Sequence, residues 1–399
     1  MAGPPIYLSR LLRLSLVGAD GMAVGSLEDV LLAPRGAGEP PRVLGFVANV
    51  QRRQIFVSAS RVGEIDSSGA HMRTGTVDLR RFELRSGELL AKGSVLDRQV
   101  GGQVVNDLAL EATTEPAGWQ VATVSLGPGG LLRRRRSSRD VEWTEVAGLF
   151  DTGPTGRQVA ALRELHPADL AKAIVALPLE RRRVLAEAME DERLADLLEE
   201  LPEDEQVRLL ESLDLERAAD VLEEMDPDDA ADLLGELPLA SRNELLEEME
   251  DEDADPLRRL LRYEADTAGG LMTPEPMVVT PATTVAEVLA RTRQPEVPMA
   301  LAAQVFVVEP PTQTPTGRYL GWVSFQRLLR EPPGNPVGGC IEGDPVVVEP
   351  DLSDLVVARR LAAYDAIALP VCDEAGRLVG AVTVDDVLDR VLPEDWRQR

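Results

Sequence analysis

The chain has 399 residues, of which 44% are hydrophobic, so it is long enough for two to four domains with cores of their own. Its 69 Asp and Glu residues outnumber its 42 Lys and Arg residues, and the net charge of −27 argues against nucleic acid and favours cations as partners. No apolar run approaches the roughly 18 to 20 residues that span a bilayer, and the N-terminus lacks the features of a secretory signal, so we expect a cytoplasmic protein that reaches a membrane only through a partner.

The first part of the chain is expected to form β structure, because short alternating runs such as RVLGFVANV lie between glycine-rich turns. It also contains a repeat. The segment DGMAVGSLEDVLL (residues 20–32) is similar to DRQVGGQVVNDLAL (residues 97–110), and each has a glycine at its bend and an Asp or Asn four residues later. The repeat predicts two small β-barrel-like units.

This glycine-based pattern resembles the PRC-barrel family. The resemblance covers residues 6–84 as a first unit and residues 85–146 as a second unit. It implies docking modules, and neither unit contains a recognisable catalytic motif.

A linker is expected at residues 147–159, shortly after the arginine run RRRRSSR (residues 133–139). A run such as Arg133–Arg136 is typically a solvated tail, but it could also lie on an acidic domain or on anionic lipid. Its role is left open.

Residues 160–262 are expected to form an acidic, all-α superhelix. Residues 161–262 hold 32 acids and 12 bases, and the helical pattern repeats every 12 residues. The repeated apolar positions are Leu165, Leu177, Met189, Leu201, Leu213, Met225, Leu237 and Met249. A helix of about two turns is not stable alone, so we predict about eight short helices stacked as a solenoid.

One repeat, MDPDDAADLLGE, holds four aspartates. Asp226 and Asp229 are assigned to the N-cap and first turn of a helix. Asp228 and Asp232 are four residues apart and therefore share one helix face, where two unpaired like charges cost roughly 0.2 to 0.5 kcal/mol. That face is either a plain solvated surface or a site for a hard cation such as Mg²⁺.

The last region, residues 263–395, is duplicated, with one copy at 271–332 and a second at 340–391. The second copy contains IALPVCDEAGRLVGAVTVDDVLDRV, which resembles a CBS motif. The resemblance implies an α/β tandem CBS pair that dimerises and binds an adenine nucleotide, ATP or AMP, between its copies.

In the second CBS copy, the resemblance places Thr383 near phosphate and Asp386 on the ribose hydroxyls. A hydroxyl at a helix N-terminus suits phosphate, and a carboxylate suits a sugar diol. The alternative is that both residues only cap the last helix. The first copy has Ser324 but Arg327 in place of the aspartate, so the resemblance does not extend to a ribose contact there.

The junction RYEADTAGGLMTPEPMVV follows the acidic superhelix and leads into the CBS pair, and this order of regions resembles MgtE-type magnesium transporters over residues 160–395. The resemblance implies that Mg²⁺ binds between superhelix and CBS acids and holds a closed form. The acids it implies are Asp196, Asp228, Asp232, Asp365 and Asp386, with Asp389 as a further candidate. One acid of the family pattern falls at Ser353.

Family members continue into a membrane pore, whereas this sequence ends just after the last CBS helix, so we expect a chain that does not conduct ions itself. The leading hypothesis is a Mg²⁺-sensing regulatory protein that acts on a separate membrane transporter or other partner. The alternative is a docking scaffold for a membrane or ribonucleoprotein assembly that carries a vestigial sensor.

Enzymatic activity is not expected. The sequence has no Walker loop, no Ser-His-Asp order and no histidine-containing metal spacing. Its two histidines, His71 and His166, lack obvious catalytic partners, and His166 is better placed to cap a helix. Cys340 and Cys372 have neither zinc-site nor disulfide spacing, so reduced, partly buried thiols are expected.

Overall fold

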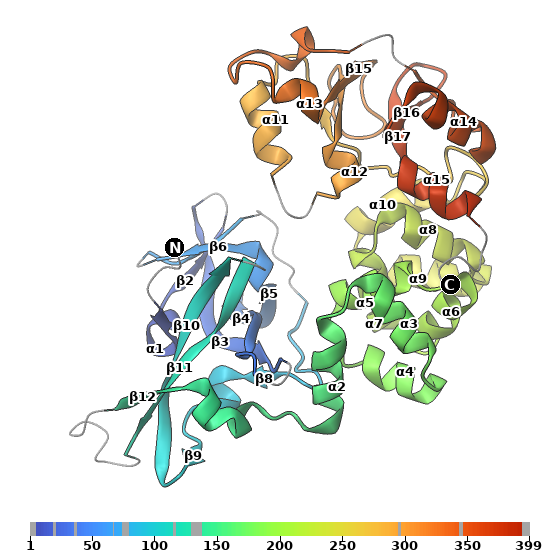
Figure 1. Cartoon of the computed structure of the whole chain (residues 1–399). Helices are drawn as coiled ribbons and strands as arrows, with labels where there is room; N and C mark the ends of the chain where they lie inside the picture. The colour runs from blue at the N-terminus through green and yellow to red at the C-terminus, as the bar shows by residue number, and fades with distance from the viewer. Residues whose placement is uncertain are drawn as a thin grey trace. The chain divides into compact units, whose positions relative to one another are not determined.

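The structure is a computed structural model in which the chain forms two compact units, residues 1–173 with 177–189 and residues 174–176 with 190–399 (Figure 1). It describes residues 5–18, 21–35, 38–66, 68–73, 80–114, 117–128, 138–293, 297–342 and 346–392. The arginine run Arg133–Arg136 lies outside these residues. None of the helices described combines the length and the apolar character that crossing a membrane requires.

The first unit is built on one 12-stranded sheet, whose main path runs β1-β10-β11-β4-β3-β2-β7-β6. The strands are β1 (Ile6–Tyr7), β2 (Ser15–Val17), β3 (Ala23–Ala33), β4 (Arg42–Val50), β5 (Arg53–Ser58), β6 (Val62–Ile65), β7 (Ala70–Met72), β8 (Leu89–Leu90), β9 (Gln99–Val100), β10 (Gln103–Thr114), β11 (Ala117–Gly127) and β12 (Arg139–Glu142). One buried core, which includes Phe46 and Leu108, runs under strands from both predicted repeats.

The two sequence repeats exchange their first strands. Strand β1, which opens the first repeat, pairs with β10 of the second, and Ile6 lies opposite Leu110. Strand β8, which opens the second repeat, pairs with β3 of the first, and Leu89 lies opposite Leu32. Each repeat therefore completes the sheet of the other, so both belong to one sheet. The boundary between residues 6–84 and 85–146 stays a prediction.

An aspartate in each repeat supports the same exchange, and in the second repeat it is Asp107, next to Asn106, which the sequence matches to Asp29. Asp29 is buried and accepts hydrogen bonds from the backbone N–H groups of Lys92 (2.7 Å) and Gly93 (3.0 Å), in the turn that follows β8. Asp107 accepts from the backbone N–H of Ser9 (3.0 Å), in the helical turn α1 (Leu8–Leu11) that follows β1. Each aspartate thus fixes the strand that arrives from the other half.

The predicted 12-residue helical repeat is confirmed. Residues 160–262, all of which the structure describes, contain eight short helices whose first residues are 12 positions apart. They are α3 (Pro167–Val175), α4 (Leu179–Ala186), α5 (Asp191–Glu199), α6 (Glu203–Leu210), α7 (Leu215–Glu224), α8 (Pro227–Glu236), α9 (Leu239–Glu248) and α10 (Asp251–Leu260), preceded by α2 (Gly153–Arg163). Prolines 178, 202 and 238 occupy N-cap positions, whereas Pro227 lies just inside the start of α8.

The CBS region has two α/β halves. The first contains β13 (Val278–Val279), α11 (Val285–Arg291), α12 (Met299–Ala302), β14 (Gln304–Val308), β15 (Tyr319–Ser324) and α13 (Phe325–Leu328). The second contains α14 (Asp354–Tyr364), β16 (Ala368–Cys372), β17 (Leu378–Thr383) and α15 (Val384–Val391). The segment before each half bridges to the other half, through Thr273 with Ala381 and Trp322 with Glu342. Within the second unit, α15 brings the CBS region to the acidic helices.

Candidate acidic cation site

The centre of the site consists of two carboxylates whose charges act on each other, Asp228 on α8 and Asp386 on α15. The surrounding protein raises the pKa of Asp228 well above its usual range, and the nearby negative charges of Asp386, Asp229 and Asp226 raise it further. The pKa of Asp386 is raised to about 6, again mainly by burial. The three charges that raise the pKa of Asp228 are all negative, so this contact brings like charges together.

Asp386 has a second role in its own helix. Its Oδ2 accepts hydrogen bonds from the backbone N–H of Thr383 (3.0 Å) and from the Thr383 hydroxyl (2.7 Å), which also donates to Asp385 (2.6 Å). These bonds lower the pKa of Asp386 but do not offset its burial. The capping interpretation of Thr383 and Asp386 therefore describes their geometry, and their contact with a nucleotide stays a prediction.

A second group of acids lies beside Asp228, where the end of α5 meets the start of α8. Carboxylate oxygens of Glu199, Asp226 and Asp229 all lie within 4.8 Å of one another. The surrounding protein raises the pKa of Glu199 to about 7, although the backbone N–H of Asp226 donates to its carboxylate at 2.9 Å. Asp226 and Asp229 do occupy the predicted N-cap and first turn, but the Asp226 side chain makes no capping bond.

Sequence reasoning missed Glu199. A signal was nevertheless present, because the same arrangement recurs 24 residues later, where the backbone N–H of Glu250 donates to Glu223 at 2.7 Å. In both cases a Glu at the end of one helix binds the N-cap residue 27 positions further on. Two 12-residue repeats therefore predict the second contact from the first.

Asp232 lies in a different environment from Asp228. Burial raises its pKa to about 6, the positive charge of Arg390 lowers it, and the negative charges of Glu203 and Asp266 raise it. Arg390, on α15, forms ion pairs with Asp266 (3.2 Å) and Glu203 (3.8 Å). The two aspartates that share a face of α8 thus meet opposite charges on α15.

The remaining predicted acids are placed less centrally. Asp196 lies near the cluster, since its charge raises the pKa of both Glu199 and Asp226, and it is paired with Arg193 at 3.2 Å. Asp365 is an exposed left-handed residue at the end of α14 and is not among the charges that shift the α8 acids. The side chain of Asp389 lies outside the part of the chain that the structure describes.

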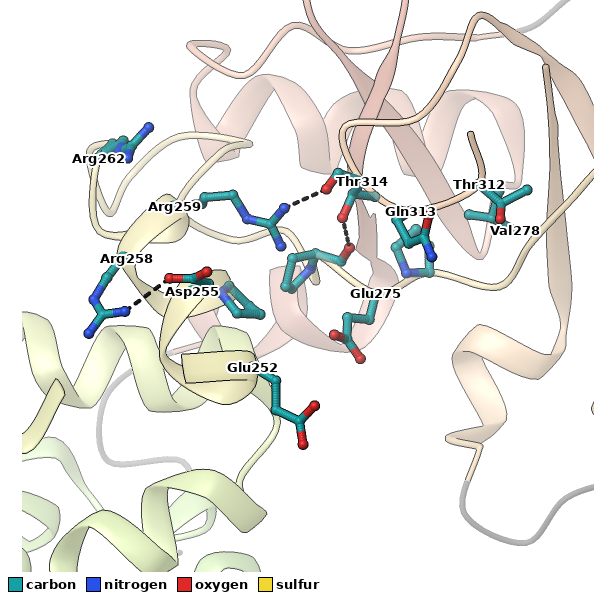
Figure 2. Close-up of a pocket in the computed structure, with 13 residues that line it drawn as sticks. Glu252, Asp255, Arg258, Arg259, Arg262, Glu275, Val278, Thr312, Gln313 and Thr314 are labelled. Atoms are coloured by element: carbon teal, nitrogen blue, oxygen red, sulfur yellow. Dashed lines mark hydrogen bonds and ion pairs between the residues drawn. The ribbon is translucent and has the colours of Figure 1, made fainter. Parts of the chain in front are cut away.

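A cavity of about 650 Å³ lies between α10 and the first CBS half (Figure 2). Arg259 projects into it from α10 and donates to the backbone carbonyl of Thr314, whose hydroxyl donates to the carbonyl of Pro274 at 2.7 Å. The charged residues that line the cavity are Glu252, Asp255, Arg258, Arg259, Arg262 and Glu275. Because these charges balance, the cavity favours neither cations nor anions.

One exposed turn of the first unit brings Asp66, Ser68 and His71 together. Nε2 of His71 lies 2.9 Å from the Ser68 hydroxyl and 3.4 Å from the Asp66 carboxylate. A nucleophilic triad needs the serine and the carboxylate on different ring nitrogens, so this turn has the wrong geometry. His166 has its predicted place, accepting from the backbone N–H of Ala168 (3.4 Å) at the start of α3, and Cys340 and Cys372 are free and buried.

The comparisons with known proteins match the helical and CBS regions. A family model described as the MgtE intracellular N domain matches residues 165–266, and a CBS domain model matches residues 337–393. A crystal structure of the cytosolic domain of the Mg²⁺ channel MgtE in complex with ATP is 35% identical, covers 62% of this chain and 98% of that chain, and has a TM-score of 0.54. The chain belongs to the MgtE family.

Other relatives support this family. The crystal structure of the soluble part of a magnesium transporter is 26% identical over 58% of this chain and 89% of that chain, with a TM-score of 0.53. The magnesium transporter MgtE of Thermus thermophilus is 43% identical over 130 residues, and that of Bacillus subtilis is 27% identical over 135 residues. These two matches span 28% and 29% of the curated relatives, and 33% and 34% of this chain. Neither of the two family models covers the N-terminal β region.

Proposed function

We propose that this chain is a Mg²⁺-responsive regulatory protein that acts on a separate membrane transporter or other partner. In this proposal, Mg²⁺ binds among the acids of α5, α8 and α15 and holds the helical domain against the second CBS half. The MgtE relatives are named as magnesium transporters and as a Mg²⁺ channel, which supports Mg²⁺ as the cation.

The observation that carries the proposal is the uncompensated pair Asp228 and Asp386. Each carboxylate has a raised pKa, which means that the surrounding protein opposes its negative charge. A divalent cation between them would replace this repulsion with attraction. The part of the contact that brings Asp228 and Asp386 together would then be stable at neutral pH only when the cation is present.

The donor atoms also fit the cation. Mg²⁺ takes oxygen ligands at about 2.0 to 2.1 Å and keeps several waters, so opposite ligands lie about 4 Å apart. The Glu199, Asp226 and Asp229 oxygens, within 4.8 Å of one another, suit a cation that retains part of its water shell. Asp228 and Asp386 would hold it from the two sides of the contact. The ion would supply positive charge.

The test is a Mg²⁺ titration of the full-length chain by calorimetry, combined with limited proteolysis by chymotrypsin. We expect binding in roughly the millimolar range, as for loose hydrated carboxylate sites, and slower cleavage when Mg²⁺ is bound. Asp228→Asn and Asp386→Asn should weaken both effects. The side-chain amide in Asp386→Asn still offers an oxygen to Thr383, so this variant changes charge more than structure. A wild-type chain whose cleavage does not respond to Mg²⁺ would refute the proposal.

A matched control is Glu244→Gln, which removes one negative charge from an exposed position on α9, a helix that contributes none of the proposed ligands. It should bind Mg²⁺ like the wild type. Asp196→Asn, Asp232→Asn and Asp365→Asn test the other acids that the family resemblance implies. We expect Asp365→Asn to have the smallest effect of the three.

An adenine nucleotide is proposed as a second ligand of the CBS pair, because the 35% identical MgtE cytosolic domain was crystallised with ATP. Thr383 and Asp386 are the proposed contacts in the second half. Calorimetry with ATP and with AMP tests this, and Thr383→Val should weaken binding if the hydroxyl meets phosphate. Nucleotide affinity unchanged in Thr383→Val would leave that residue only its capping role.

Homodimerisation through the CBS pair is also proposed, since α14 and α15 carry exposed apolar side chains. Leu355 is 57% exposed, Tyr364 is 62% exposed and Leu388 is 49% exposed. Side chains of this type are more often found in a subunit interface when several share one surface. Light scattering should give twice the chain mass, and Leu388→Glu should reduce it.

The alternative function is a docking scaffold based on the PRC-barrel-like sheet. It is favoured by one observation, that the sheet has its own core and lies in a compact unit separate from the CBS region. A fragment that keeps the whole sheet, residues 1–152, should then retain the partners of the full chain in a pull-down. Loss of those partners would favour the sensor.

A further inference from the structure

Arg390 connects the second CBS half with two separate segments of the helical region. Its Nη2 lies 3.2 Å from Oδ1 of Asp266, in the junction after α10, and its Nη1 lies 3.8 Å from Oε1 of Glu203, at the start of α6. The Arg390 side chain is 25% exposed, whereas Glu203 and Asp266 are 70% and 83% exposed. The guanidinium is therefore held in the contact while its partners face solvent.

Burial raises the pKa of Asp232, on α8, and the charge of Arg390 lowers it. The contrast with Asp228 is clear, because the charges that act on Asp228 come from other acids. One part of the contact between α8 and α15 therefore contains its own positive charge, and the other part does not.

A guanidinium differs from a bound metal ion in one important respect. It is charged at every physiological pH and is covalently part of the chain, so its effect does not depend on the concentration of any ligand. It also excludes a divalent cation from the acids that it contacts, because two positive charges would then share one site.

We propose that Arg390 is a built-in counter-charge for Glu203 and Asp266, with which it forms ion pairs. It keeps part of the contact between the helical domain and the second CBS half in the metal-free chain and leaves a divalent cation to act at Asp228 and Asp386. The role given to the divalent cation rests on the proposed Mg²⁺ response, whereas the ion pairs of Arg390 do not.

The experiment compares Arg390→Gln, Arg390→Lys and the wild type as full-length chains dialysed against EDTA. Chymotrypsin is used because the substitutions change sites for trypsin. Since two exposed ion pairs are weak, we expect cleavage near the junction to be about two- to fivefold faster in Arg390→Gln, with Arg390→Lys close to the wild type. Equal cleavage of the wild type and Arg390→Gln would overturn the proposal, and so would a lysine variant that is cleaved as fast as the glutamine variant.

Calorimetry provides a second readout that a purely structural defect would not produce. In Arg390→Gln the acids lose their counter-charge and become available to metal, so the number of Mg²⁺ ions bound should rise by one. Arg208→Gln is the matched control, because it removes an arginine whose ion pairs with Asp204 (3.1 Å) and Glu205 (3.2 Å) stay within α6. It should change neither cleavage nor stoichiometry.

The partner acids give an independent test. Combined Glu203→Gln and Asp266→Asn substitutions should accelerate cleavage to the same extent as Arg390→Gln, and adding Arg390→Gln should accelerate it little further. If Mg²⁺ does not change cleavage of the wild type, but Arg390→Gln is still cleaved faster than the wild type in EDTA, the sensor proposal is refuted and the arginine contact is not. The reverse result would refute only the arginine contact.

Discussion

Lowering the pH should stabilise the metal-free chain. Among the acids whose pKa is raised in the folded protein, Glu199 moves from 4.5 to about 7, and Asp232 and Asp386 move from 3.8 to about 6. A carboxyl group with a raised folded pKa binds protons more tightly in the folded state. Its penalty is absent below about pH 4, grows as the pH rises, and is complete above about pH 7.

The magnitude follows from the pKa values. A rise from 4.5 to about 7 corresponds to roughly 3 kcal/mol for Glu199 if the full effect is felt. These carboxylates are only half-buried, so solvent screening reduces the value to about 1 kcal/mol each, and their mutual coupling prevents simple addition. We expect the free energy of unfolding to rise by about 1 to 3 kcal/mol between about pH 7.5 and about pH 5.5.

Urea unfolding followed by circular dichroism, after dialysis against EDTA, measures this gain. A chain with a net charge of −27 gains some stability from protonation at any acid. The informative quantity is therefore the difference in pH dependence between the wild type and a variant. Glu199→Gln changes the charge by one and should flatten the pH dependence, whereas Glu244→Gln on α9 should not. Parallel pH curves for the wild type and Glu199→Gln would refute the reasoning. Millimolar Mg²⁺ should also flatten the wild-type curve, since it removes the same repulsion.

Further substitutions test individual contacts. Asp228→Arg should place a second guanidinium opposite Asp386 and make the chain resist chymotrypsin without Mg²⁺. Asp29→Ala should lower the free energy of unfolding by about 1 to 3 kcal/mol, because two partly buried N–H groups lose their acceptor. Gly380→Ala should destabilise the protein by about 1 to 3 kcal/mol, since its Cβ would lie 2.6 Å from a backbone oxygen. The Cβ of Gly235→Ala would meet nothing within 4 Å, so this substitution should stabilise α8. Thermal unfolding measures both effects. Residues 6–84 expressed alone should form dimers or aggregates in size-exclusion chromatography, because the fragment lacks β8 and β10.

The helical repeat could be predicted from sequence because its causes are local. A 12-residue interval of apolar residues, prolines and acids determines where each helix begins and ends, and the helices indeed begin at that interval. The CBS halves were predictable for a similar reason, since a strand, a turn and a helix start follow one another within about 25 residues.

The exchanged strands could not be predicted in the same way. The two copies of the β repeat indicated that the same structure occurs twice, but a repeat does not state which copy its first strand joins. Pairing of Ile6 with Leu110 closes a loop of about a hundred residues, and no local signal in the turn near Asp29 or Asp107 records it. The aspartates indicate the exchange only once the hydrogen bonds that they accept are known.

Helix α8 shows that the periodicity of one helix is not enough to assign its acids as metal ligands. Asp228 and Asp232 share one face, so a single cation site was a reasonable hypothesis for both. Four residues nevertheless span about 6 Å along a helix, and the facing helix α15 presents Asp386 and Arg390 at the same spacing. Asp228 therefore meets a negative charge and Asp232 a positive one. Whether an acid needs a metal ion depends on the residue across the contact, and the periodicity of its own helix cannot supply that information.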